Sequence, residues 1–189
     1  MRVIFSLVLA VLLGSNSHLC SADDDLSTII NYREYSPQFS SSGQPTAAQL
    51  KAVSEAGFER VVYLAFSDNH TAIEAEDRVV KKLAMDYVHI PVDFDNPTLE
   101  DFEDFAAVMK RDERKRTLLH CQINLRASTF SFLYRVIYGG VAMAQAKQDL
   151  DAIWVPDEVW YKFIVTVLQQ HGLSHKCDDC VCGENEFDE

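Results

Sequence analysis

The sequence predicts an α/β fold, a three-layer sandwich in which a mainly parallel sheet is flanked by helices. Short runs of β-branched, aromatic and other apolar residues alternate with segments of helical periodicity, which is typical of parallel sheets. The last third of the chain shows helical patterns alone. The expected strands are 60–66, 87–90 and 116–120, and the expected helices are 46–56, 72–85, 98–110, 127–138, 141–152 and 157–170.

The N-terminal half of this pattern begins with a polar lead-in. Residues 23–44 are rich in serine, and we expect at most one short edge strand there. The first helix is predicted over 46–56, because Pro45 and Thr46 are typical of a helix start and Gly57 of a helix end. The strand that follows is rich in β-branched and aromatic residues, and the next helix is amphipathic.

A loop and two further elements lead to the middle of the chain. The strand 87–90 ends at Pro91, and the loop 92–97 follows it. Thr98 is a typical N-cap for the next helix, which carries acidic residues in its first turn. The strand 116–120 is short and apolar. The last three helices are separated by a glycine pair, Gly139–Gly140, and by a segment with a proline, Val155–Pro156.

The chain divides into three segments. Residues 1–22 have a positive start, an apolar run and small residues near the end, which is typical of a secretory signal peptide. Residues 23–172 are expected to form one domain, and 173–189 an acidic, cysteine-rich tail. The apolar run is shorter than the roughly 20 residues of a membrane span. We therefore expect an exported protein, periplasmic or secreted, without a membrane span.

The overall charge limits the classes of partner. The chain has 17 basic and 29 acidic residues, a formal net charge of −12. Such a surface repels nucleic acid and anionic membranes, so we expect neither as a partner. The sequence does not indicate the oligomeric state.

Cys121 is the residue that points most directly to chemistry. It follows an apolar strand, and Arg126 stands at the start of the next helix. In such a loop the backbone N–H groups converge, the helix N-terminus adds positive potential, and the arginine can grip two oxygens of a phosphate. The same field favours the thiolate, which is the nucleophilic form. The structural alternative is a small buried residue at a helix start.

The neighbours of Cys121 are candidate substrate-binding residues. His120 is expected to position the loop or tune the thiolate, or to be satisfied by the backbone at the strand end. Asn124 is expected to supply a left-handed backbone conformation, because the loop has no glycine. Ser128 is expected either to donate to the leaving sulfur or to cap the helix. The remaining candidates are the loop residues Gln122, Ile123 and Leu125.

Cleavage of a phosphate ester also requires an acid that protonates the leaving oxygen. Asp93 and Asp95 are the candidates, because they follow another strand of the predicted sheet and ligands bind at the carboxyl ends of strands. We favour Asp93, which is closer to the strand end. The alternative for both is a solvated loop carboxylate or an Asx turn.

Five short motifs resemble one family, the protein tyrosine phosphatase superfamily, in its dual-specificity-like bacterial branch related to the beta-lactamase hydrolase-like phosphatase domain. The resemblance runs from about residue 31 to 164. The motifs are Ser42–Thr46, Ala56–Phe58, Ile90–Val92 with Pro97–Thr98, His120–Cys121 and Arg126–Ser128.

The resemblance implies a cysteine-based phosphatase fold. It also implies that Cys121 forms a cysteinyl-phosphate, that Arg126 clamps the phosphate, and that Asp93 or Asp95 is the general acid. No metal and no cofactor are implied. The substrate would be a phosphorylated small molecule or protein, with phosphotyrosine among the candidates.

Two departures from the family pattern keep alternatives open. Four residues separate Cys121 from Arg126 where the main line has five, and Ala127 stands where the main line has Ser or Thr. Four intervening residues also occur in rhodanese-like sulfurtransferases, whose cysteine carries a persulfide. The alternatives are therefore a sulfurtransferase that uses Cys121 and a non-catalytic phosphate-binding module.

The tail has a Cys-x2-Cys-x-Cys cluster formed by Cys177, Cys180 and Cys182. Thiolates with nearby histidines suit zinc or copper(I), but in an oxidising compartment a disulfide between two of the three is the plainer expectation. The aromatic residues Trp154, Trp160 and Tyr161 are assigned to core packing, without a functional role.

Overall fold

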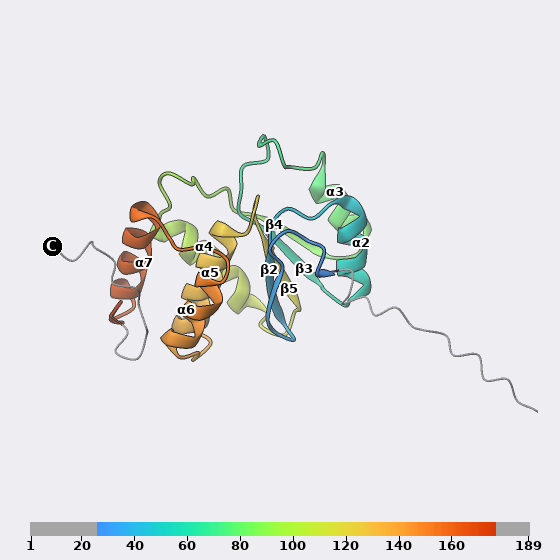
Figure 1. Cartoon of the computed structure of the whole chain (residues 1–189). Helices are drawn as coiled ribbons and strands as arrows, with labels where there is room; N and C mark the ends of the chain where they lie inside the picture. Colours follow the sequence, from blue (N-terminus) through green and yellow to red (C-terminus); the bar gives the residue numbers. More distant parts are fainter. Residues whose placement is uncertain (1–25, 177–189) are drawn as a thin grey trace, which may run out of the picture.

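The structure, a computed structural model, describes residues 26–176. The expected signal peptide and the three tail cysteines lie outside the described residues. Within the described part, a sheet lies between two layers of helices (Figure 1). This arrangement confirms the predicted three-layer α/β sandwich.

The sheet has five strands in the order β1-β2-β5-β3-β4. The four strands from β2 to β4 run parallel, and β1 pairs antiparallel with β2 at the edge. The sheet is therefore mainly parallel, as the sequence predicts. The strands are β1 (Arg33–Ser36), β2 (Phe39–Ser42), β3 (Arg60–Tyr63), β4 (Asp86–His89) and β5 (Thr117–His120).

The expectation of at most one edge strand in the lead-in is wrong, because this segment holds both β1 and β2. The second strand lies beside β5 and is fully buried. Its serine hydroxyls are satisfied, because Ser40 bonds to Tyr32, Ser41 bonds to Tyr35, and Ser42 donates to the adjacent carbonyl. A polar run can therefore form an inner strand, since each buried hydroxyl has a hydrogen-bond partner.

Helices cover both faces of the sheet (Figure 1). One face packs against α2 (Ala47–Glu55) and α3 (Glu76–Lys82) through a smaller apolar cluster. The other face carries the larger, aromatic core, which includes Phe102, Phe105 and Trp160. The helices on this side are α4 (Leu99–Arg111), α5 (Leu125–Ile137), α6 (Met143–Asp151) and α7 (Glu158–Gln170).

Two helix starts follow the predicted capping chemistry. Thr46 and Thr98 form capping boxes with Gln49 and Asp101. The helix predicted over 72–85 is shorter, because the preceding segment forms turns and Ala75 adopts a left-handed conformation with φ of 52°. No helix among the described residues combines the length and the apolar character that a membrane crossing requires.

Candidate active site

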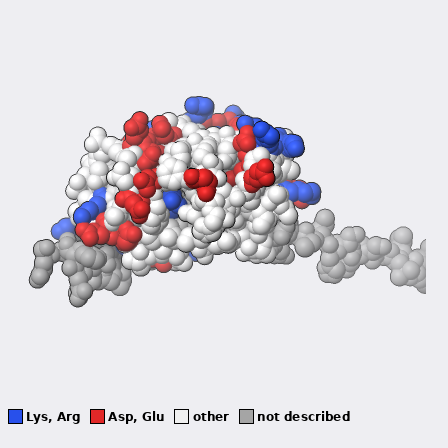
Figure 2. All heavy atoms as spheres, turned by 90° about the horizontal axis from the view of Figure 1, so that it is seen from above, with Lys and Arg blue, Asp and Glu red and all other residues white. Residues whose placement is uncertain are grey.

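Cys121 and Arg126 lie at the carboxyl edge of the parallel strands. Cys121 directly follows β5, and Arg126 is in the first turn of α5. The side chains are 1% and 6% exposed, so both are held inside the fold. Viewed from above, this end of the molecule is rich in acidic side chains, with Lys and Arg mostly toward its edges (Figure 2).

The Cys121 loop is held from one side by the segment after β2. Gly43 pairs with Ile123 in an isolated β-bridge, and the backbone N–H of Gln44 donates to the carbonyl of Gln122 at 2.9 Å. A Cβ on Gly43 would lie 2.9 Å from that carbonyl oxygen and 3.0 Å from Cα of Ile123. The close approach therefore requires glycine, which gives a physical reason for this part of the sequence motif.

Asn124 supplies the left-handed turn of the loop, as the sequence predicts. Its φ is 74°, and its side-chain amide donates to the carbonyl of Asn31 at 2.6 Å. The amide of Asn31 donates in turn to the carbonyl of Ile123 at 2.9 Å. These reciprocal bonds fix the loop conformation without a glycine in the loop.

Arg126 links the cysteine loop to the loop after β4. Its Nε donates to the carbonyl of Val92 at 3.1 Å, and its Nη1 donates to Oε1 of Gln122 at 3.2 Å. The guanidinium also lies 5.0 Å from the ring centroid of Phe94, a cation–π contact. The structure therefore brings together the Cys121 loop and the loop that carries Asp93 and Asp95.

Both candidate acids are exposed in the loop after β4. Asp93 lies between Val92 and Phe94, the two loop residues that contact Arg126. Its Oδ1 accepts a hydrogen bond from the backbone N–H of Asp95 at 3.0 Å, an Asx turn. Among the described residues neither carboxylate bonds to Cys121 or Arg126. Asp93 is adjacent in sequence to both Val92 and Phe94, whereas Asp95 is adjacent to Phe94 alone.

Trp160 holds the same loop from the other side. Its indole Nε1 donates to the carbonyl of Phe94 at 3.0 Å, and the side chain is fully buried. The sequence pattern predicts core packing alone for Trp160, and this hydrogen bond is an additional role that the pattern does not predict. An indole buried in a helix of apolar periodicity carries no signal in the sequence for a hydrogen bond to a distant loop.

The hydroxyl groups at the start of α5 bond within the helix. Ser128 Oγ donates to the carbonyl of Leu125 at 3.1 Å, and Thr129 Oγ1 donates to the same carbonyl at 3.0 Å. Both residues are fully buried. In this structure they therefore satisfy the helix backbone rather than contact the sulfur of Cys121.

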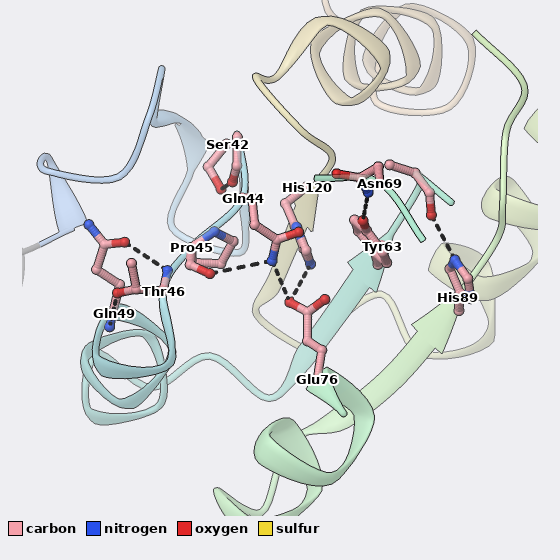
Figure 3. Close-up of polar contacts among 12 residues, drawn as sticks. Ser42, Gln44, Pro45, Thr46, Gln49, Tyr63, Asn69, Glu76, His89 and His120 are labelled. Carbon is pink, nitrogen blue, oxygen red and sulfur yellow. Dashed lines mark hydrogen bonds and ion pairs between the residues drawn. The ribbon is translucent and has the colours of Figure 1, made fainter. Parts of the chain in front are cut away.

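A buried polar cluster surrounds His120, the residue directly before Cys121 in the sequence (Figure 3). His120 is fully buried, with its Nε2 at 3.2 Å from Oε1 of Glu76, and its ring stacks on Tyr63 with centroids 4.6 Å apart. The amide of Gln44 donates to the same Glu76 oxygen at 3.0 Å. Glu76 gives no signal of this contact in the sequence, because a glutamate in a polar, acidic stretch has the pattern of a solvated helix start.

Tyr63 is a neutral neighbour of this cluster. Burial raises the pKa of its phenol to about 12, and the nearby carboxylate of Glu76 adds to the effect of burial. The hydroxyl donates to the carbonyl of Phe66 at 3.1 Å and accepts from the amide of Asn69 at 2.6 Å. The phenol therefore stays protonated at physiological pH.

No group of three or more His, Cys, Asp or Glu side chains within residues 26–176 has an arrangement suited to a metal ion. The three tail cysteines lie outside this range, whereas the two histidines near them, His171 and His175, lie inside it. His171, which is described, is 2.9 Å from Oε1 of Glu103. It is therefore engaged with the helical core.

Comparison with known proteins places the fold and the family. The family model described as DSP-PTPase phosphatase fused to NAD+ Kinase matches residues 20–153. A DUF442 protein from Shewanella putrefaciens CN-32, described as a phosphatase, is 33% identical with a TM-score of 0.72. The match covers 78% of this chain and 97% of that chain.

Two more distant structures share the fold. Tk-PTP is 18% identical with a TM-score of 0.64, covering 74% of this chain and 97% of its own. TpbA of P. aeruginosa is 17% identical with a TM-score of 0.59, covering 72% and 84%. No curated protein matches the chain in sequence.

These findings confirm the resemblance seen in the sequence motifs. The family match extends over most of the domain that holds the Cys121 loop. The identity to the Shewanella protein extends over nearly the whole of that structure. The chain therefore belongs to this DSP-PTPase family of the protein tyrosine phosphatase superfamily, whose members are phosphoric monoester hydrolases.

Proposed function

We propose that the protein is an exported, cysteine-dependent phosphatase that hydrolyses phosphate monoesters through a cysteinyl-phosphate on Cys121. Arg126 binds the phosphate, and Asp93 is the general acid. One observation carries the proposal: Cys121 and Arg126 stand at the two ends of a loop whose backbone is tied to Gly43 and Gln44. Such a loop presents backbone donors, a guanidinium and a thiol to one bound oxyanion.

The proposed reaction has two displacements at phosphorus. In the first, the thiolate of Cys121 forms an S–P bond while the P–O ester bond breaks, and Asp93 donates its proton to the leaving oxygen. In the second, water attacks the phosphorus, the S–P bond breaks, and the carboxylate of Asp93 takes a proton from the water. The products are the alcohol and inorganic phosphate, and the thiolate and the protonated acid are restored.

The guanidinium of Arg126 bonds to both loops of the proposed site. Nε and Nη1 donate to Val92 and Gln122 in this structure. On phosphate binding, a phosphate oxygen would replace the Gln122 side chain as the acceptor for Nη1. The bond from Nε to Val92 would keep the loop that carries Asp93 in place. A planar guanidinium suits this exchange, because its donors lie in a fixed fork.

The substrate class rests on the chemistry of the loop and on the relatives. A variant of TpbA holds pTyr in its structure, and SIW14 of S. cerevisiae is described as a PP-IP phosphatase. Proteins of this fold are thus associated with more than one kind of phosphate compound. We infer a phosphate monoester for this protein, either a small molecule or a phosphorylated protein, with phosphotyrosine included.

Export is inferred from residues 1–22, whose composition is that of a secretory signal. Fractionation of cells that express the full chain or a chain lacking residues 2–22 tests this part. The full chain should leave the cytoplasm, and the shortened chain should remain in it. Retention of the full chain in the cytoplasm would contradict export and would leave the phosphatase proposal intact.

The mechanism is tested by trapping the intermediate. Wild-type protein is mixed with an aryl phosphate and quenched in acid, and the peptide that contains Cys121 is analysed by mass spectrometry. We expect a phosphate on Cys121 in the wild type and in Cys180→Ser, a control that removes a tail thiol, and none in Cys121→Ser. Turnover without any phosphorylated Cys121, or phosphorylation of another residue, would contradict the proposed mechanism.

A further inference from the structure

We propose that Glu76 is a positioning residue for the candidate nucleophile, holding both flanks of Cys121 and keeping His120 protonated so that Cys121 remains a thiolate. The proposal rests on the cysteine mechanism given above. Figure 3 shows one oxygen of the carboxylate facing two side chains from separate elements. Oε1 accepts from Nε2 of Gln44 at 3.0 Å and lies 3.2 Å from Nε2 of His120.

The two contacts reach the residues on either side of Cys121. His120 directly precedes Cys121 at the end of β5. Gln44 donates its backbone N–H to the carbonyl of Gln122, the residue that directly follows Cys121. A single carboxylate on α3 therefore contacts one flank directly and the other through Gln44. Loss of the carboxylate loosens the backbone on both sides of the sulfur.

The charge argument follows from burial. Glu76 is 5% exposed and His120 is fully buried, so an isolated charge on either residue would be costly. Within residues 26–176, the ion pair with His120 is the single one that Glu76 makes. Oε2 of Glu76 has no hydrogen-bond partner among these residues. Both ring nitrogens of His120 also lack a hydrogen-bond partner among these residues, so the contact with Glu76 is an ion pair without a formed hydrogen bond. In the proposed state the carboxylate is paired with the imidazolium, and an imidazolium adjacent to Cys121 stabilises the thiolate.

The other groups that face His120 do not replace Glu76 as the anion. Tyr63 of β3 stacks on the imidazole, and burial keeps it a neutral phenol by raising its pKa to about 12. His89 of β4 stacks on the far side of Tyr63, with centroids 5.1 Å apart. Gln44 is uncharged, and Arg126 at the other end of the cysteine loop is cationic. Glu76 is the carboxylate in contact with the imidazole.

The backbone before Glu76 is consistent with a specific placement of this side chain. Ala75 has φ of 52°, a conformation that disfavours residues with a Cβ, and α3 begins directly after it. The turn points the first residue of the helix inward, although acidic residues at a helix start usually face solvent. A local conformation of this cost is retained where the surrounding structure requires it.

The test is an ultraviolet titration of the Cys121 thiolate as a function of pH. The spectrum of the same protein carrying Cys121→Ser is subtracted, so that the other cysteines cancel. Glu76→Gln keeps the shape and removes the charge, and Glu76→Asp keeps the charge. Glu74→Gln is the matched control, because Glu74 is an exposed carboxylate two residues away. Thermal unfolding of each variant checks that the protein is folded at the pH of each reading.

We expect Glu76→Gln to raise the pH of half-ionisation by about one unit, as expected when a nearby opposite charge is lost. Glu76→Asp should shift it less, and Glu74→Gln should leave it unchanged. His120→Asn should give the same upward shift, and the double variant no further shift, because both changes remove one ion pair. A titration of folded Glu76→Gln that coincides with the wild type would overturn the proposal, as would additive shifts in the double variant.

The outcome separates this inference from the proposed function. Aryl phosphate hydrolysis is measured on the same wild-type and variant samples. If the titration shifts as expected but the wild type shows no turnover that depends on Cys121, the phosphatase mechanism fails and the Glu76 inference stands. If turnover depends on Cys121 but the titration of folded Glu76→Gln is unchanged, the reverse holds.

Discussion

Nε of Arg126 donates a 3.1 Å hydrogen bond to the carbonyl oxygen of Val92, so the proposed phosphate clamp is bonded to the loop that carries the candidate acid. The contact joins the start of α5 to the loop after β4. A displacement of this loop would therefore break the bond or change the orientation of the guanidinium.

Replacement of Arg126 by lysine should lower kcat/KM for an aryl phosphate by about 10²–10³-fold, because an ammonium cannot form the fork to two phosphate oxygens. Steady-state kinetics measure the effect. Arg114→Lys is the control, since the Arg114 side chain is 93% exposed. Activity of Arg126→Lys within threefold of the wild type would remove Arg126 from the proposed site.

Replacement of Asp93 by asparagine should lower kcat by about 10²-fold for a substrate with a poor leaving group, and much less for one with a good leaving group. The reason is that only a poor leaving oxygen needs the proton. Asp95→Asn should change kcat for either substrate by less than about threefold, because solvent screens the charge of an exposed carboxylate. The reverse ranking of the two variants would identify Asp95 as the acid instead.

Trp160→Phe should lower the free energy of unfolding by about 1 kcal/mol more than Trp154→Phe, measured by denaturant titration. The change removes the hydrogen bond to Phe94 and leaves that carbonyl without its donor. Trp154 is a matched control, because its buried indole N–H has no hydrogen-bond partner within the described residues. Equal losses for the two variants would show that the indole bond to the loop contributes nothing to stability.

Asp149 should make stability depend on pH through its bonds to Arg33 and Arg135. Burial tends to raise the pKa of this carboxyl, but the hydrogen bonds from the two arginines outweigh it, so the pKa lies below its usual value. A lowered folded-state pKa gives stability that is present above the unfolded value and is lost as the pH falls through the folded value.

Asp149→Asn should therefore reduce the free energy of unfolding near neutral pH by about 1 kcal/mol, with the difference from the wild type shrinking below about pH 4. Denaturant titrations at several pH values measure it. Asp151→Asn, which removes an i,i+4 ion pair with Lys147 within α6, should have a smaller effect. A difference that is constant from pH 3 to pH 7 would contradict this account.

The layer order and the Cys121 loop could be predicted from local patterns. The apolar strand before Cys121 and the helical spacing after Arg126 place these two residues at a strand end and a helix start, as the structure has them. Thr98 caps its helix because the capping box depends on residues three positions apart. Information of this range is contained in the sequence.

Contacts between distant segments could not be predicted. β2 has a serine-rich sequence, and its burial depends on hydroxyl partners in and before β1. Glu76 has the local pattern of a solvated residue, but the fold places it against His120, which lies 44 positions later. The bond from Trp160 to Phe94 likewise joins residues 66 positions apart. In each case tertiary contacts outweigh the local pattern.

Hydrolysis of an aryl phosphate by the purified protein, with and without Cys121→Ser, tests the central claim most directly. The account predicts turnover in the wild type and in Cys180→Ser, and a loss to background in Cys121→Ser. A thermal unfolding curve checks that the Cys121→Ser protein is folded. Turnover that persists in folded Cys121→Ser would contradict a cysteine-dependent mechanism. Absence of turnover in the reduced wild type would contradict a general phosphate monoesterase activity.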